Sequence, residues 1–195
     1  MIQIRPYRPG DRADVYDICV RTAAAGGDAT GIYSSDDLMP DVFAGPYVDS
    51  EPELAFVVDT QAGDTGQRAS GYIIGTADTR RFVDRFRREQ VPAFAERYRD
   101  PSAVDAPIVA LGLDPERMLI AEVDEYPAHL HIDLLPELQG RGLGRRLVET
   151  FAEALRSRGV RGLHLVMDPA NTGARSFYDR IGFTELPSGA LGMRL

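Results

Sequence analysis

The amino-acid sequence predicts an α/β fold in which a mixed, mostly antiparallel central sheet has helices on both faces. Three observations predict this class. The length of 195 residues fits one domain, residues 1–195, with a substantial core. Two β-type runs in the first half are joined by a short polar loop, which is typical of an antiparallel hairpin. In the second half, strand-type and helix-type segments alternate, which favours parallel pairing.

The N-terminal quarter of the chain predicts a strand and two helices. Residues 2–5 alternate in character and predict an opening strand. Asp11 is placed to cap a helix whose apolar face runs from Val15 to Thr22. Residues 28–53 mix turn and apolar residues, which suggests a short second helix whose length Pro40 limits.

The hairpin and an aromatic helix follow. Residues 54–59 and 69–77 are β-branched and aromatic runs that predict the two hairpin strands. Residues 80–98 place four aromatic side chains at near-helical intervals around Pro92, so we expect a kinked or two-part helix. This arginine-rich helix could pack its aromatic face on the sheet or act as a substrate lid, and the sequence leaves both open.

The second half carries the alternating elements. Residues 118–123 predict either a helical turn or a strand. The remaining elements are a strand over 128–136, an amphipathic helix over 140–159, a strand over 162–168, a helix over 172–181 and two strands over 182–195.

Composition excludes several classes of function. The net charge of −8 opposes long-range attraction to nucleic acid and to anionic membranes, so an anionic ligand must be held by local groups. All 22 basic side chains are arginine, and the lack of lysine excludes Schiff-base chemistry and a Walker-type phosphate site. Cys19, the one cysteine, lies on an apolar stripe and is interpreted as core. No secretory or membrane-spanning segment is apparent, so we expect a cytoplasmic protein.

A glycine-rich segment links the strand over 128–136 to the helix that follows. It consists of Gln139, Gly140, Arg141, Gly142, Leu143, Gly144 and Arg145. Glycines let a diphosphate approach the main chain, and the free N–H groups and dipole of a helix N-terminus attract its oxygens. On its own the pattern also fits a tight strand-to-helix turn. The position of the third glycine disfavours a dinucleotide-binding fold.

Two motifs in this half resemble the GNAT superfamily of N-acetyltransferases. Together they cover about residues 128–186, and their order and spacing are more specific than either motif alone. The first is carried by Leu134, Pro136, Gln139, Gly140, Gly142 and Gly144, and the second by Asn171, Ala174, Phe177, Tyr178, Gly182 and Phe183. More loosely, the segments AGGDAT, GPYV, EPELAFVVD, GYIIGTADT and ERYRDP resemble the acetyltransferase-like C-terminal domain of eukaryotic O-GlcNAc hydrolases and its free-standing bacterial relatives.

This resemblance implies a GNAT-type fold with a splayed pair of parallel strands at 130–135 and 163–168. It implies acetyl-CoA as cosubstrate, with the pantetheine arm inserted between these strands. Main-chain groups of Leu134 and Leu135 are then expected to bind that arm. The amides from Gln139 to Arg145 are expected to hold the pyrophosphate.

The resemblance also implies roles for single side chains. Asn171 is expected to contact the pantetheine. Tyr178 is expected to lie near the thioester sulfur and to protonate the departing thiolate, although a tyrosine that only fills the core is the alternative. Asp168 could cap the helix that contains Asn171 or shape the acceptor site. Asp28 and Tyr33 lie on an early loop that borders the acceptor pocket in this family, so they are expected substrate contacts.

The general base is sought among polar residues of the strand over 128–136. His129, His131 and Asp133 alternate and therefore share one face of that strand. We expect His131 or Asp133, directly or through water, to remove the amine proton, but the three residues could also form a plain polar face of the sheet. Without further clustered ligands, no metal site is expected.

The sequence therefore predicts transfer of an acetyl group from acetyl-CoA to a small-molecule or peptide amine, by direct attack in a ternary complex. The alternatives are a non-catalytic acetyl-CoA-binding module, acting as a sensor or scaffold, and a regulator that binds another phosphate ligand. No nucleic-acid or membrane partner is expected. The terminal strands could pair between subunits, which would make a homodimer.

Overall fold

The computed structural model describes residues 2–61, 69–167 and 171–195. The strands form a seven-stranded sheet in the order β1-β2-β3-β4-β5-β7-β6. They are β1 (Gln3–Pro6), β2 (Phe56–Asp59), β3 (Ala69–Thr76), β4 (Ala128–Leu134), β5 (Gly162–Leu165), β6 (Thr184–Glu185) and β7 (Leu191–Arg194). The α-helices are α1 (Arg12–Thr22), α2 (Leu38–Phe43), α3 (Gly45–Ser50), α4 (Thr79–Glu89), α5 (Val91–Arg97), α6 (Ala106–Leu113), α7 (Leu143–Arg156) and α8 (Thr172–Arg180). Short 3₁₀ turns are η1 (Pro9–Asp11), η2 (Pro52–Leu54), η3 (Pro115–Met118) and η4 (Pro136–Leu138).

Strands β4 and β5 form a parallel pair in an otherwise antiparallel sheet. Their described register joins Ala128 to Leu163 and His129 to His164. Strand β4 then continues to Leu134 against β3 alone. The edge of β4 that faces β5 is therefore open beyond His129, and the predicted mixed sheet with a splayed parallel pair is confirmed.

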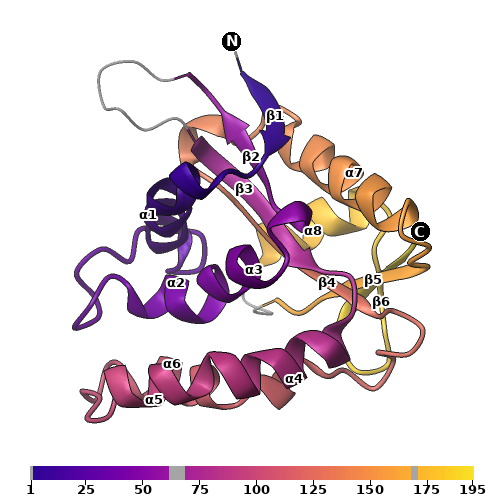
Figure 1. The fold of residues 1–195 in the computed structure, drawn as a ribbon. Coiled ribbons are helices and arrows are strands. Elements are labelled where there is room, and N and C mark those ends of the chain that lie inside the picture. Colours follow the sequence, from indigo (N-terminus) through magenta and orange to yellow (C-terminus); the bar gives the residue numbers. More distant parts are fainter. Residues whose placement is uncertain (1, 62–68, 168–170) are drawn as a thin grey trace.

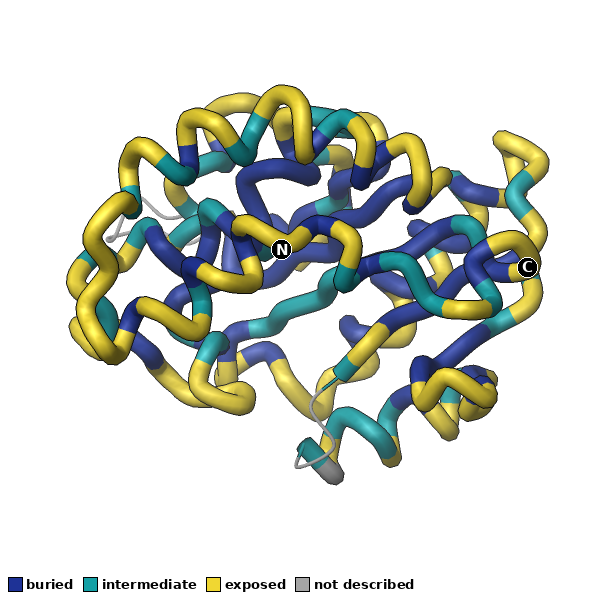
Figure 2. The backbone as a smooth tube through the Cα atoms, turned by 90° about the horizontal axis from the view of Figure 1, so that it is seen from below, coloured by how far each residue is buried: buried dark blue, intermediate teal, exposed yellow. Residues whose placement is uncertain are grey.

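Helices cover both faces of the sheet (Figure 1). Tyr72 and Ile74 of β3 pack with residues of α1, α3 and α4, whereas Ile73 between them packs with α7. This alternation follows from the two-residue period of a strand. Figure 2 shows the result, with buried strands in the middle and helices exposed on their outer sides. The two predicted helical layers are thus confirmed.

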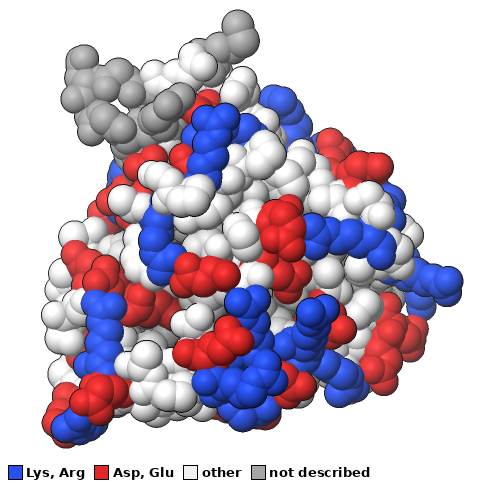
Figure 3. Space-filling model, in the orientation of Figure 1, with Lys and Arg blue, Asp and Glu red and all other residues white. Residues whose placement is uncertain are grey.

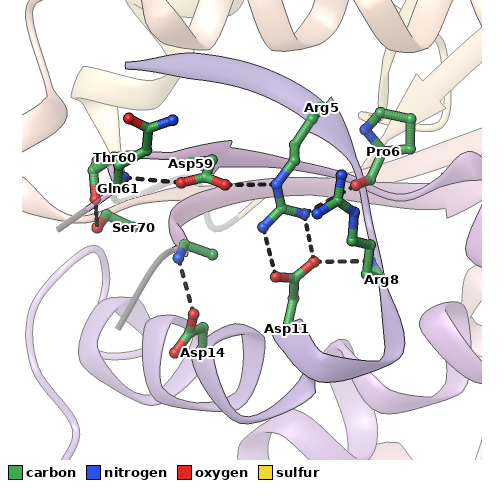
Figure 4. Close-up of polar contacts among 10 residues, drawn as sticks. Arg5, Pro6, Arg8, Asp11, Asp14, Asp59, Thr60, Gln61 and Ser70 are labelled. Carbon is green, nitrogen blue, oxygen red and sulfur yellow. Dashed lines mark hydrogen bonds and ion pairs between the residues drawn. The ribbon is translucent and has the colours of Figure 1, made fainter. Parts of the chain in front are cut away.

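A buried ion network ties the first strand to the first helix (Figure 4). Arg5, which is 7% exposed, donates from Nε to Asp59 (2.7 Å) and from Nη1 and Nη2 to Asp11 (2.6 and 2.7 Å). Asp11 also accepts the main-chain N–H of Arg8 (2.8 Å). The prediction that Asp11 caps α1 is therefore wrong, because its carboxylate is turned toward Arg5 and makes no cap bond to the helix.

Three local predictions need revision. Residues 28–53 contain two short helices, α2 and α3, rather than one, and Pro40 lies in the first turn of α2, where proline is tolerated. Residues 119–123 form neither a helix nor a strand, although Val123 is buried. Helix α6 was not predicted, because its largely apolar sequence shows no helical periodicity.

The helices α4 and α5 confirm the predicted two-part element. Phe82 and Phe86 pack into the main core, and Phe94 packs into a smaller cluster with α2 and α6. The exposed arginines of α4 pair with acidic neighbours, as in Arg85 with Glu89 and Arg87 with Asp84. Figure 3 accordingly shows acidic and basic groups side by side over this face. In the described ranges, none of the helices combines the length and the apolar character that crossing a membrane requires.

Candidate active site

A cleft of about 670 Å³ opens where β4 and β5 separate. Its walls come from the end of β4, the glycine-rich segment, the first turn of α7, helix α8 and the residues after α1. The sequence elements that carry the two motifs thus meet at one cavity. The lining side chains that matter for chemistry are Asp133, Tyr178 and Asn171.

The glycine-rich segment presents main-chain donors to this cleft. Gly140 and Gly142 adopt positive φ angles of 71° and 73°, and Gly142 is the N-cap residue directly before α7. A Cβ atom at either glycine would meet no heavy atom within 4 Å, so the main chain is open to a ligand. Among the described residues, the N–H groups from Gly140 to Arg145 have no main-chain acceptor. These donors, with the dipole of the 14-residue helix α7, fit a diphosphate.

Gly144 has a different role from the first two glycines. A Cβ atom at Gly144 would lie 3.1 Å from the ring of Phe177, so glycine here lets α7 approach α8. Arg145 also lines the cleft and donates to the carbonyl of Arg180 at the end of α8 (3.2 Å). Arg141 is exposed, whereas Leu143 is buried and lines the cleft. The segment therefore positions α8 as well as a ligand.

Leu134 and Leu135 differ in what their main chains can do. The N–H of Leu135 donates to Ser70 on β3 (3.1 Å), and its carbonyl accepts from Leu138 (2.9 Å). Because main-chain groups alternate in direction along a strand, those of Leu134 point toward the open edge. The carbonyl of Leu134 accepts from the side chain of Gln139 (3.0 Å). Leu134 therefore offers its N–H to the cleft, whereas both groups of Leu135 are engaged within the protein.

Asn171 is the N-cap of α8, where its side-chain oxygen accepts from the N–H of Ala174 (3.0 Å). The same residue lines the cleft. Asp168, predicted as a cap or acceptor-site residue, lies outside the described residues.

Tyr178 and Asp133 approach the cleft from opposite faces of the sheet. Tyr178 is 8% exposed and packs against Phe183 on the α7 side. Asp133 accepts a hydrogen bond from Tyr72 (2.5 Å) on the α1 side. They meet because β4 and β5 separate at this point. The cleft thus holds a phenol and a carboxylate on either side of one strand.

Burial shifts the pKa values of both groups in the same direction. Burial raises the pKa of Tyr178, and the negative charge of Asp133 raises it further. Burial also raises the pKa of Asp133, and hydrogen bonds from Tyr72 and Thr22 offset only part of this effect. Tyr178 is therefore a protonated donor at neutral pH, and Asp133 is a stronger base than an ordinary carboxylate.

His131 does not line the cleft. Its Nε2 atom lies 3.0 Å from the hydroxyl of Tyr47. Burial lowers the pKa of His131 to about 3, with a further contribution from the positive charge of Arg117. The structure thus separates the two candidate bases, because Asp133 reaches the cleft and His131 does not. Within the described ranges, no group of His, Cys, Asp or Glu side chains is arranged to hold a metal ion.

The predicted substrate contacts Asp28 and Tyr33 do not line the cleft. Asp28 is exposed and accepts from the N–H and hydroxyl of Thr30 (2.8 and 2.6 Å). Tyr33 packs against the apolar clusters of α2 and α6, and no residue from 80 to 98 lines the cleft. Instead, Thr22, Ala25 and Gly26 border it. The sequence signal there is Gly26 and Gly27, and a glycine pair directly after a helix is typical of a helix end rather than of a site.

Comparisons with known proteins agree with this geometry. The family model described as "Acetyltransferase (GNAT) family" matches residues 36–183. The crystal structure of SsHAT is 54% identical, covers 99% of this chain and 98% of its own, and superposes with a TM-score of 0.90. A GNAT family acetyltransferase from Brucella melitensis in complex with acetyl-CoA shares the fold at 17% identity, with a TM-score of 0.51 over 100% of this chain and 88% of its own.

Among curated proteins, the O-GlcNAcase of Rattus norvegicus is 24% identical over 94% of this chain. The chain spans about one fifth of that relative's length, since the match covers 20% of it. A mycothiol acetyltransferase of Beutenbergia cavernae is 45% identical over 49 residues, which cover 25% of this chain and 16% of its own length.

Proposed function

The chain belongs to the acetyltransferase (GNAT) family, and we propose that it transfers an acetyl group from acetyl-CoA to an amine by direct attack in a ternary complex. The observation that carries this proposal is one cleft that combines open main-chain donors with Tyr178 and Asp133. Acetyl-CoA, when bound, supplies the activated thioester.

The binding roles follow from the groups that the cleft offers. The N–H groups from Gly140 to Arg145 receive the pyrophosphate, and the side chain of Arg145 adds positive charge beside them. The N–H of Leu134 receives the pantetheine along the open edge of β4. The side chain of Asn171 borders the same path.

Two side chains carry out the proton transfers of the reaction. Asp133, directly or through one water molecule, takes a proton from the acceptor nitrogen, which forms the new bond to the acetyl carbon. Tyr178 gives its proton to the sulfur as the carbon–sulfur bond breaks. The products are an acetylated amine and free CoA thiol. The raised pKa of Asp133 suits the base, while the raised pKa of Tyr178 keeps its proton in place until the thiolate forms.

Calorimetry with acetyl-CoA, followed by a thiol-release assay against a panel of amines and peptides, tests the proposal. We expect binding and thiol release that depends on an amine. Binding without release across a broad panel would favour the non-catalytic module. Absence of binding would favour a regulator that takes another phosphate ligand.

Replacing Tyr178 by Phe tests its role directly. We expect turnover to fall by about 10²-fold, with little change in acetyl-CoA affinity, because the general acid is lost while the ring is kept. Tyr98→Phe, outside the cleft, is the matched control. Full activity of Tyr178→Phe would reduce Tyr178 to a core residue. A cytoplasmic location, a homodimer and the single domain over 1–195 stay predictions.

A further inference from the structure

A chain of hydrogen bonds runs inward from His131 and fixes the proton positions along it. The carbonyl of Pro127 can only accept, so the hydroxyl of Thr79 donates to it (2.7 Å). Thr79 must then accept from Nδ1–H of His129 (2.7 Å), which leaves Nε2 of His129 as an acceptor. The hydroxyl of Tyr47 donates to this Nε2 (2.8 Å) rather than to the more distant sulfur of Met118 (3.5 Å). Tyr47 in turn accepts from Nε2–H of His131 (3.0 Å). This order requires neutral histidines, and burial lowers the pKa values of both.

The end of this series of hydrogen bonds, at His131, is therefore a hydrogen-bond acceptor. With Nε2 of His131 donating to Tyr47, its Nδ1 atom carries a lone pair. In the described part of the chain, Nδ1 has no hydrogen-bond partner. Among the described residues, the fully buried side-chain nitrogen or oxygen atom that lacks a hydrogen-bond partner is Oε2 of Glu122. Because Nδ1 of His131 lacks a partner and is not such an atom, it is accessible to solvent.

Arg117 places a free cation beside this acceptor. Its guanidinium lies over the ring of Phe43 (5.2 Å), and that ring lies 5.9 Å from His131. Burial lowers the pKa values of His131 and His129, and the positive charge of Arg117 lowers them further. Its Nε atom donates to the carbonyl of Leu111 (2.9 Å), which leaves the two terminal amino groups available.

Arg117 is unusual among the arginines of this chain. Over the described ranges, the other arginines without a carboxylate partner are exposed, whereas Arg117 is partly buried and has no ion pair. Burial lowers its pKa, and the negative charge of Asp114 offsets only part of this effect, because removing a charge from water is costly. A bound anion would offset this cost.

We propose that Arg117 and His131 bind the acceptor, and that the acceptor is a peptide-like amine with a carboxylate at its far end. The proposal rests on the acetyl transfer proposed above. His131 lies two residues before Asp133 on the same face of β4, so it is about 7 Å from the base. An amine held at Asp133 then presents an N–H group to Nδ1 of His131 and a carboxylate to Arg117. A dipeptide has these three groups in this order.

The phosphates of CoA do not account for the free cation. The diphosphate-binding segment follows the C-terminal end of β4, whereas Arg117 acts on His131 and His129, toward the other end of that strand.

Binding can be tested without any acetyl transfer. N-acetylglycine carries the N–H group and the carboxylate but no amine, and N-acetylglycinamide is its neutral counterpart. We would titrate each into protein labelled with ¹⁵N in the histidine rings. The His131 signal is assigned by its loss in His131→Asn. We expect N-acetylglycine to shift that signal saturably, and the amide to bind at least about tenfold more weakly.

Variants of Arg117 test whether its guanidinium binds the carboxylate. Arg117→Gln should weaken N-acetylglycine binding by about tenfold or more, Arg117→Lys should weaken it less, and the exposed Arg88→Gln should leave it unchanged. Retained acetyl-CoA binding shows that each variant is folded. Equal binding of acid and amide, or equal binding by Arg117→Gln, would overturn the proposal.

Measurements of acetylation kinetics provide a second test. Glycylglycine should be acetylated with a lower KM than glycylglycinamide, and Arg117→Gln should remove that difference mainly through KM. If no amine is acetylated while N-acetylglycine still binds through Arg117, the anion site stands and the proposed catalysis fails. If both dipeptides react equally well, the carboxylate is not recognised and the acceptor assignment is wrong.

Discussion

Two aspartates on the same side of the sheet, the buried Asp11 and the partly buried Asp133, have opposite properties. Burial alone would raise the pKa of Asp11, but the hydrogen bonds and charge of Arg5 bring it below its ordinary value. Asp133 has neutral partners, Tyr72 and Thr22, and its pKa is raised. Asp11 belongs to the ion network of Figure 4, whereas Asp133 faces the cleft. The partner, not the burial, thus decides whether a carboxylate serves stability or can serve as a base.

Breaking the ion network should have the largest effect on stability. Arg5→Leu leaves the carboxylates of Asp11 and Asp59 buried without their cation, so we expect a loss of about 3–5 kcal/mol in the free energy of unfolding. Denaturant unfolding measures this loss. The control Arg80→Leu removes an exposed ion pair with Asp124 and should cost less than about 1 kcal/mol. Similar losses in the two variants would contradict a special role for the network.

Asp133→Asn should have the reverse profile, with a large effect on catalysis and little on stability. We expect kcat to fall by about 10²–10³-fold, because the general base is lost. The free energy of unfolding at neutral pH should stay unchanged or rise, because a partly buried carboxylate without a cation is removed. Steady-state kinetics and denaturant unfolding of one preparation check both. Unchanged kcat would exclude Asp133 as the base.

The two aspartates should also respond oppositely to pH. The lowered pKa of Asp11 contributes stability above its unfolded value, about 3.9, and this is lost as pH falls through the folded pKa. The raised pKa of Asp133 means that the folded state holds its proton more tightly. Its contribution to stability therefore declines as pH rises from the unfolded pKa through the folded one. Unfolding of Asp133→Asn across pH 3–7 should lack this decline, and a profile that matches the unmodified protein would contradict the assignment.

The smallest expected effect is at the glycine-rich segment. Gly142→Ala forces a side chain into a φ of 73° and should cost about 1–2 kcal/mol of stability. It should also weaken acetyl-CoA binding, because relief of that strain moves the N–H donors. Gly159→Ala is the matched control, since Gly159 has a φ of 74° but does not line the cleft. Equal acetyl-CoA affinity in the two variants, by calorimetry, would argue against the segment as the diphosphate site.

The elements predicted well are those with strong local signals. The hairpin of β2 and β3, strand β4, helix α7 and the terminal strands all carry clear periodicity bounded by turn residues. Helix α6 and the turns over 119–123 lack such periodicity, and tertiary packing decides their conformation. Asp11 shows the same limit, because a capping pattern predicted a local bond and Arg5, from another element, took the carboxylate.

The sequence by itself determined that a glycine-rich segment presents open amides at a helix start, and in the structure these are the amides from Gly140 to Arg145, because glycine and helix termini are local features. It could not determine which polar side chain of β4 lines the cleft, since alternation places His131 and Asp133 on the same face. Only the separation of β4 from β5 decided that, by opening the strand edge at Asp133, whereas His131 lies outside the cleft beside the rings of Tyr47 and Phe43. Such contacts join residues far apart in the chain, and no local pattern encodes them.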